Sequence, residues 1–481
     1  MHDTLSPEIA LADRIQGCWL GKSIGGTLGL PAEGRMERLH FDFYDPVPSI
    51  APPNDDLELQ LVWLHMIEQS TGHLTQEDFA DSWLQHLHYM WDEYGRCRWN
   101  LRRGVPLKAI GTFENHFLSG MGSPIRSEIW ASLFPDDSDS AAYYAALDAS
   151  LDHGPEGIAG EVFFAVMQNA VASGQDVHSA IALAMNYIPK DSETTHAIEL
   201  VLASHAAGIE EWTCWQQLVA QYGNENFTHA PLNVALTVWA LFYGEEDFEN
   251  SILLAVNGGY DTDCTAATVG ATLGFLLGQK RVPAKWITPI GEDIYIGSGI
   301  LGIDAASTLS ELTRRTVALI GKLEPKKWDP TLFYFLPEPV DLSSLPGTIF
   351  ITPLGSQTPV PWANGELPME VKQAGGGTWT WRKGTDEIRQ IICLAREGAR
   401  LFINDTLLIE CPPGLPYIPA THRNPSGSGC AVAIGTGTHT IRLELNSSND
   451  QEASVLLTYP NLHIAPWTQE ELPHPASLPI P

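Results

Sequence analysis

The feature that most constrains the fold is a change of pattern near residue 330. From about residue 8 to 330 the chain is rich in Ala and Leu, and apolar residues recur three and four positions apart. That period is typical of amphipathic helices, and it is clearest over residues 160–170, 192–207, 231–243 and 307–322. After Leu323 come short β-branched or alternating runs, at residues 347–352, 378–381, 388–394, 400–403 and 438–445, separated by turns such as GGG, NDT and PSGSG. Such runs indicate an antiparallel sandwich.

The length of the chain agrees with a division into domains. It has 481 residues, which is more than one hydrophobic core usually accommodates. Four prolines mark a connecting segment: Pro325, Pro330, Pro337 and Pro339. We therefore predict a multidomain fold, with an all-α domain over residues 1–335 and an antiparallel β-sandwich over residues 345–481.

Charge and cysteine content exclude several classes of partner. The formal net charge is -31, so the surface repels nucleic-acid backbones and anionic membranes, and neither is expected as a partner. The run RCRWNLRR at residues 96–103 is the obvious candidate for a local basic pocket. The seven cysteines are scattered without metal-ligand spacing, and no secretory signal or membrane-spanning run is evident, which predicts a cytoplasmic protein. Oligomerisation stays open.

Two acidic segments lie about 200 residues apart, PNDD at residues 53–56 and GGYDTD at residues 258–263. Carboxylates at a helix start are favoured by the unpaired N–H groups, so each segment alone is explained as a helix N-terminus. Together, Asp55, Asp56, Asp261 and Asp263 supply the hard oxygen ligands that Mg²⁺ prefers. A cation would also relieve the repulsion among them.

Three motifs in this order resemble the ADP-ribosylglycohydrolase family. They are the opening GCWLGKSIGGTLGLPAE at residues 17–33, LDHG at residues 151–154, and the segment 259–270 around the second aspartate pair. The resemblance covers roughly residues 10–300. It implies an all-α fold with a binuclear Mg²⁺ centre that hydrolyses the bond between ADP-ribose and its acceptor.

The resemblance also assigns residues. The metal ligands that it implies are Asn54, Asp55, Asp56, Asp261, Asp263 and Cys264. Glu33 is expected to position the scissile ribose, and Glu33, Asp55 and Asp56 are the predicted catalytic residues. The predicted substrate-binding residues are Asp152, His153, Gly154, Gly122 and Tyr260.

The chain departs from the family pattern at three positions. Asn54 stands where a threonine is expected, and its amide oxygen can still bind a hard ion. Gly26 replaces an aspartate of the opening motif. Cys264 replaces the last threonine ligand, and a thiol is a poor ligand for Mg²⁺. The number of metal ions, one or two, is therefore open, and Ca²⁺ or Mn²⁺ stays an alternative to Mg²⁺.

The predicted function is a metal-dependent hydrolase of a glycosidic bond at a sugar anomeric carbon, with a small-molecule or protein-linked ADP-ribose substrate placed first. The alternatives are a glycoside or nucleoside hydrolase acting on other sugars, and a non-catalytic protein that binds a sugar or ADP-ribose.

The C-terminal part, with Trp362, Trp379 and Trp381, weakly resembles a carbohydrate-binding or PA14-like module. A domain that covers the catalytic cleft or forms a dimer contact is an equal alternative.

Overall fold

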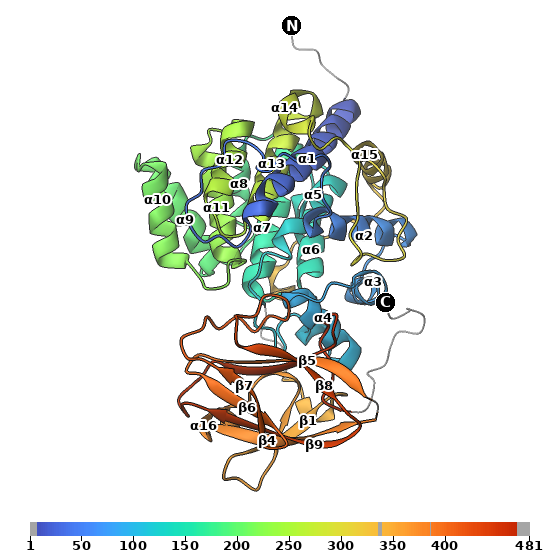
Figure 1. Ribbon diagram of the computed structural model, residues 1–481. Coiled ribbons are helices and arrows are strands. Elements are labelled where there is room, and N and C mark those ends of the chain that lie inside the picture. The colour runs from blue at the N-terminus through green and yellow to red at the C-terminus, as the bar shows by residue number, and fades with distance from the viewer. Residues whose placement is uncertain (1–6, 335–338, 385, 469–481) are drawn as a thin grey trace. The chain divides into compact units, whose positions relative to one another are not determined.

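The computed structural model describes residues 7–334, 339–384 and 386–468, and it divides into two compact units (Figure 1). Of the described residues, those up to 88 and those from 118 to 334 form the first unit. Those from 89 to 117 and those from 339 onward form the second unit.

The first unit is helical, as the sequence predicts. Its α-helices are α1 (Pro7–Gly29), α2 (Asp55–Gln69), α3 (Gln76–His86), α5 (Glu128–Leu133), α6 (Ser138–Ala149), α7 (Pro155–Ala172), α8 (Val177–Ala184), α9 (Glu193–Ala206), α10 (Glu211–Tyr222), α11 (Ala230–Tyr243), α12 (Phe248–Asn257), α13 (Thr262–Leu277), α14 (Ala284–Ile287) and α15 (Leu309–Ala318). Short 3₁₀ turns lie at Leu30–Ala32, Pro124–Arg126, Gln279–Arg281 and Pro330–Leu332. Among the described residues, no helix has both the length and the apolar character needed to cross a membrane.

Helices α1 and α13 pack side by side with unusually close backbones (Figure 1). Four glycines at every fourth position of α1 make this contact: Gly17, Gly21, Gly25 and Gly29. A Cβ atom on Gly21 would lie 1.9 Å from the carbonyl oxygen of Gly270, and one on Gly25 would lie 2.0 Å from that of Ala266. Only glycine permits such an approach. The small residues of α13, among them Gly270 and Gly274, therefore meet a matching stripe of glycines on α1.

The second unit contains two antiparallel sheets. One has the strand order β2-β1-β4-β9-β6-β7 and the other the order β3-β10-β5-β8. The strands are β1 (Ile349–Pro353), β2 (Val360–Trp362), β3 (Gly365–Glu366), β4 (Gly376–Lys383), β5 (Glu387–Ala395), β6 (Ala399–Ile403), β7 (Thr406–Cys411), β8 (Gly429–Ile434), β9 (Gly437–Leu445) and β10 (Ala453–Thr458), with the short helix α16 (Met369–Gln373) between β3 and β4. The predicted sandwich architecture is confirmed.

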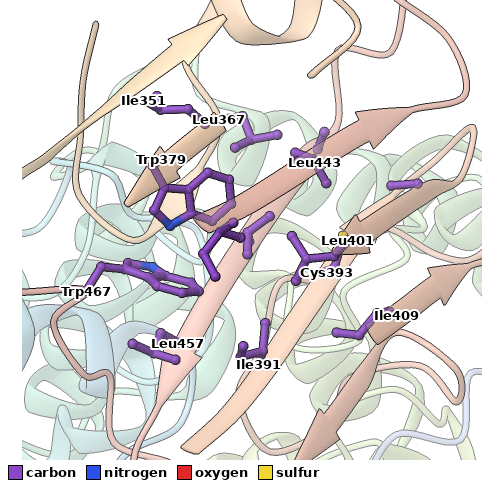
Figure 2. Close-up of a cluster of buried hydrophobic side chains, with 14 of the residues drawn as sticks. Ile351, Leu367, Trp379, Ile391, Cys393, Leu401, Ile409, Leu443, Leu457 and Trp467 are labelled. Atoms are coloured by element: carbon purple, nitrogen blue, oxygen red, sulfur yellow. The ribbon is translucent and has the colours of Figure 1, made fainter. Parts of the chain in front are cut away.

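The core of this unit is built by side chains from both sheets. Figure 2 shows Trp379 of β4 and Leu443 of β9 from the six-stranded sheet, with Ile391 of β5 and Leu457 of β10 from the other. The tryptophans that suggested a carbohydrate-binding module lie in this core, because Trp362, Trp379 and Trp381 are only 1%, 3% and 0% exposed. They pack as apolar side chains and form no surface platform for a sugar.

Helix α4 (Asp92–Arg103) belongs to the second unit, although it comes from the middle of the helical part of the sequence. Arg103 donates hydrogen bonds to the carbonyl oxygen of Pro346 at 3.0 Å and to Thr348 Oγ1 at 3.1 Å. Arg96 donates to the carbonyl oxygen of Asn364 at 3.3 Å. The arginines of the basic run thus connect this helix to the sandwich. The predicted first domain, residues 1–335, did not separate this segment, because helical periodicity does not indicate which core a helix joins.

Candidate metal centre

The first acidic segment forms the N-terminus of α2. Asn54 is the N-cap residue, and its Oδ1 accepts a hydrogen bond from the backbone N–H of Asp56 at 2.7 Å. Asp55 and Asp56 form the first turn, where the helix dipole favours carboxylates. Asp56 is 1% exposed and Asp55 is partly buried. The helix-start explanation is correct, and it also fixes where these acids lie.

The second acidic segment forms the N-terminus of α13 after a strained turn. Gly259 and Tyr260 both adopt positive φ, 71° and 67°, and this conformation is uncommon for an aromatic residue. Tyr260 N–H donates to the carbonyl oxygen of Arg35, and its own carbonyl accepts from Gly34 N–H, both at 2.9 Å. The turn therefore ties the loop that carries Glu33 to the start of α13.

The two helix starts converge. Asn54 Nδ2 lies 3.4 Å from Asp263 Oδ2, and Cys264 Sγ lies 3.7 Å from Asp56 Oδ2. Two sets of ligand atoms lie within 4.8 Å of one another: Asp56, Asp263 and Cys264 form one, and Glu33, Asp261 and Asp263 form the other. The structure thus brings together acids that lie about 200 residues apart in the sequence. Glu33 is exposed, whereas the other acids of both sets are buried.

Burial disfavours the charged form of the carboxylates in this cluster. Burial and the neighbouring Asp56 raise the pKa of Asp55 well above its usual value. Burial likewise raises the pKa of Asp56 to about 7 and that of Asp263 to about 7, and it raises the pKa of Asp261 well above its usual value, with Asp263 as the next cause. A divalent cation among these groups would favour the charged carboxylates again.

The available donor atoms fit a hard cation. Within the described residues, Asp261 Oδ2 and Asp263 Oδ1 are buried without a hydrogen-bond partner. Buried polar atoms are rarely left unpaired, because each costs free energy. The carbonyl oxygen of Cys264 accepts from Thr268 Oγ1 at 2.9 Å within α13. Cys264 therefore offers the centre its thiol, which is a soft ligand.

A buried lysine lies beside the centre and was not foreseen among the site residues. Lys22 of α1 is 1% exposed, and its Nζ lies 3.4 Å from Asp56 Oδ1 and 3.1 Å from Glu128 Oε1. Burial opposes the ammonium form, but the Glu128 and Asp56 carboxylates outweigh it and raise the pKa of Lys22. Gln60 Nε2 and Gln168 Nε2 donate to Glu128 at 2.8 and 3.2 Å. The sequence signal that could have indicated this role is that Lys22 is the only charged residue of the glycine-rich segment 17–29.

Two of the predicted substrate-binding residues are buried in an ion-pair cluster. Asp152 is 0% exposed and binds Arg126 through both oxygens, at 2.7 and 2.9 Å. His153 Nδ1 lies 2.9 Å from Asp152 Oδ1. Although burial alone would raise it, Arg126 and His153 lower the pKa of Asp152 to about 2. Asp148 also pairs with Arg126, at 2.9 Å. In this structure Asp152 holds Arg126, and His153 lies against Asp152. Substrate binding by Asp152 and His153 stays a prediction.

The remaining predicted substrate residues are also buried: Gly122, Gly154 and Tyr260. Gly122 accepts a hydrogen bond from Arg126 at 2.9 Å, and Gly154 donates to the carbonyl oxygen of Leu118 at 2.8 Å. The Tyr260 side chain is 5% exposed. Substrate binding by these residues stays a prediction. Of the three, Tyr260 is the one whose backbone holds the loop that carries Glu33.

Comparison with known proteins identifies the family of the first unit. The family model described as ADP-ribosylglycohydrolase matches residues 7–323. A protein of uncharacterised function from Archaeoglobus fulgidus is 22% identical over 333 residues, which is 64% of this chain and 100% of that protein. ADP-ribosylarginine hydrolase Tri1 of Pseudomonas putida (strain GB-1) is 27% identical over 302 residues, 60% of this chain and 76% of that protein. A solved structure described as an ADP-ribosylglycohydrolase-related protein complex is 19% identical, with a TM-score of 0.45 over 66% of this chain and 100% of that one.

The match to this family model extends over more than half of the chain. The chain belongs to the ADP-ribosylglycohydrolase family, whose model covers nearly all of its first unit.

Proposed function

We propose that this protein is a divalent-metal-dependent hydrolase that cleaves the glycosidic bond between ADP-ribose and an acceptor. The observation that carries the proposal is the convergence of two aspartate helix starts, within a chain of this family, around buried oxygens that have no hydrogen-bond partner among the residues that the structure describes. Asp261 and Asp263 would hold the ion, with Asp55, Asp56 and Asn54 beside it. When bound, a divalent ion orients sugar hydroxyls and a water molecule and offsets developing negative charge. Mg²⁺ is the first ion to test, followed by Mn²⁺ and Ca²⁺.

Glu33 is the residue that we assign to proton transfer. Its carboxylate is exposed at the solvent side of the cluster, within 4.8 Å of the Asp261 and Asp263 ligand atoms. Hydrolysis at an anomeric carbon requires a carboxylate that accepts a proton as the water oxygen bonds to that carbon and the acceptor leaves. The backbone of Tyr260 holds the Glu33 loop against α13, so the base and the aspartates keep a fixed relation.

The acceptor to test first is arginine, because one relative is named an ADP-ribosylarginine hydrolase. The purified chain is incubated with an ADP-ribosylated arginine peptide, and release of ADP-ribose is measured with Mg²⁺, with EDTA, and with Mg²⁺ restored. We expect release that EDTA abolishes and Mg²⁺ restores. Asp263→Ala should abolish release, and Glu33→Gln should lower kcat by about 10²–10⁴-fold. Asp81→Ala, on the exposed face of α3, is the matched control.

Three outcomes would contradict this proposal. Release unaffected by EDTA or by Asp263→Ala would exclude a role for the metal centre. Hydrolysis of aryl glycosides or nucleosides but not of ADP-ribosyl substrates would favour the alternative sugar hydrolase. Binding of ADP-ribose without turnover of any of these substrates would favour the non-catalytic alternative.

A further inference from the structure

The two candidate ligand sets differ in their surroundings, although they share Asp263. The set of Glu33, Asp261 and Asp263 consists of carboxylates only. Two of its oxygens, Asp261 Oδ2 and Asp263 Oδ1, are buried without a hydrogen-bond partner among the described residues. This set therefore has both the negative charge and the unused lone pairs that a hard divalent ion requires.

In the other set, both oxygens of Asp56 already have neighbours. Oδ1 faces the Lys22 ammonium at 3.4 Å, and Oδ2 faces the Cys264 thiol at 3.7 Å. Neither neighbour is a hydrated surface group, because Lys22 is 1% and Cys264 is 8% exposed. An ion bound to Asp56 would stand next to a fixed positive charge and a soft sulfur ligand, and both disfavour Mg²⁺.

A second carboxylate, that of Glu128, holds the Lys22 ammonium in place. Glu128 is 0% exposed and lies 3.1 Å from Lys22 Nζ. Its carboxylate is held in turn by the side-chain amides of Gln60 and Gln168. Because this network is buried and its carboxylate is held on both oxygens, Lys22 cannot swing away to admit a second cation without leaving Glu128 unpaired.

We propose that the centre binds one divalent cation through Asp261 and Asp263, on the side that Glu33 borders, and that Lys22 supplies the positive charge on the Asp56 side. Lys22 is then a positioning residue, which orients Asp56 through the contact at 3.4 Å and occupies the place of a second ion. The inference rests on the proposed function only in assuming that a divalent ion binds.

The test counts Mn²⁺ ions bound to the full chain by equilibrium dialysis with metal analysis, and examines them by electron paramagnetic resonance. We expect one Mn²⁺ per chain with a mononuclear spectrum. Asp261→Asn should weaken binding at least about 100-fold, whereas Asp56→Asn should keep one ion with affinity changed by less than about 10-fold. Two ions with an exchange-coupled spectrum, or greater sensitivity to Asp56→Asn than to Asp261→Asn, would overturn the proposal.

A second variant tests Lys22 itself. Lys22→Met combined with Glu128→Gln removes the ammonium together with one carboxylate that it neutralises, and Cys264→Thr is added to supply an oxygen ligand. We expect this triple variant to bind a second Mn²⁺, and a folded variant that still binds one would argue against the role of Lys22. If the variant does not fold, the two aspartate variants decide alone. If two ions bind and ADP-ribose is released, this inference is refuted and the proposed function stands. If one ion binds and no ADP-ribose is released, this inference stands and the proposed function is refuted.

Discussion

Replacing Gly25 by alanine tests whether the close packing of α1 on α13 sets the stability of the first unit. The added Cβ would lie 2.0 Å from the carbonyl oxygen of Ala266 and 2.3 Å from its carbon. Cβ atoms in proteins essentially never come closer than 3.0 Å to such an atom, so the backbones must separate by about 1 Å, the difference between the two distances. Forcing atoms into a packed interface costs up to about 3 kcal/mol.

The neighbouring residue, Gly26, is a matched control on the same helix. Its Cβ would meet only the Asn54 side chain, with Nδ2 at 3.0 Å, and Ala267 Cβ at 3.8 Å. Both substitutions gain about 1 kcal/mol from the better helix propensity of alanine. We therefore expect Gly25→Ala to lose about 2 kcal/mol net, and Gly26→Ala to be neutral or up to about 1 kcal/mol more stable.

The assay is thermal and urea unfolding followed by far-ultraviolet circular dichroism, with both variants measured beside the unchanged chain. A net loss of about 2 kcal/mol corresponds to a Tm lower by roughly 4–8 °C. If Gly25→Ala unfolds at the same temperature as Gly26→Ala or above it, the close approach of the two backbones does not limit stability and the reasoning is wrong.

Three further predictions follow from the same contacts. Arg126→Leu leaves Asp152 and Asp148 buried without their cation, so we expect a loss of about 3–5 kcal/mol in urea unfolding; a loss below 1 kcal/mol would argue against the ion-pair cluster. Asn364→Ala removes buried hydrogen bonds to Leu457 and Ala465 in the second unit. The free energy of unfolding of that unit should therefore fall by about 2–4 kcal/mol, while metal binding is unchanged. Mn²⁺ at 100 times its Kd should stabilise the chain by about 2.7 kcal/mol, and this gain should vanish in Asp263→Ala; no thermal shift in the unchanged chain would contradict a metal centre.

Local patterns predicted the elements well, because period and turn chemistry act over a few residues. The helical pattern at residues 231–243 corresponds to α11, Ala230–Tyr243, and the run at 438–445 corresponds to β9, Gly437–Leu445. The two acidic segments were found for the same reason, since each is a helix start that is visible within four residues. The membership of α4 in the second unit was not predictable in this way, because its partners, such as Pro346 and Asn364, lie about 250 residues away.

The contacts of Lys22 could not be predicted from a local pattern, because its two carboxylate partners lie 34 and 106 residues further along the chain. Their meeting depends on the orientation of α1, which the glycine stripe sets by placing Gly21 and Gly25 against α13. Each residue along a helix is turned by about 100° from the one before it. Lys22 and Gly26 directly follow Gly21 and Gly25, so they lie on a different face of α1 from those glycines, one helical turn apart from each other. That face meets α2: Lys22 faces Asp56, and a Cβ on Gly26 would touch Asn54. The missing aspartate at position 26 and the lysine at position 22 therefore both make the surroundings of the α2 N-terminus less negative. A site with one acid fewer and a fixed ammonium needs less positive charge from metal ions, which is why the departures from the family pattern point to one ion rather than two.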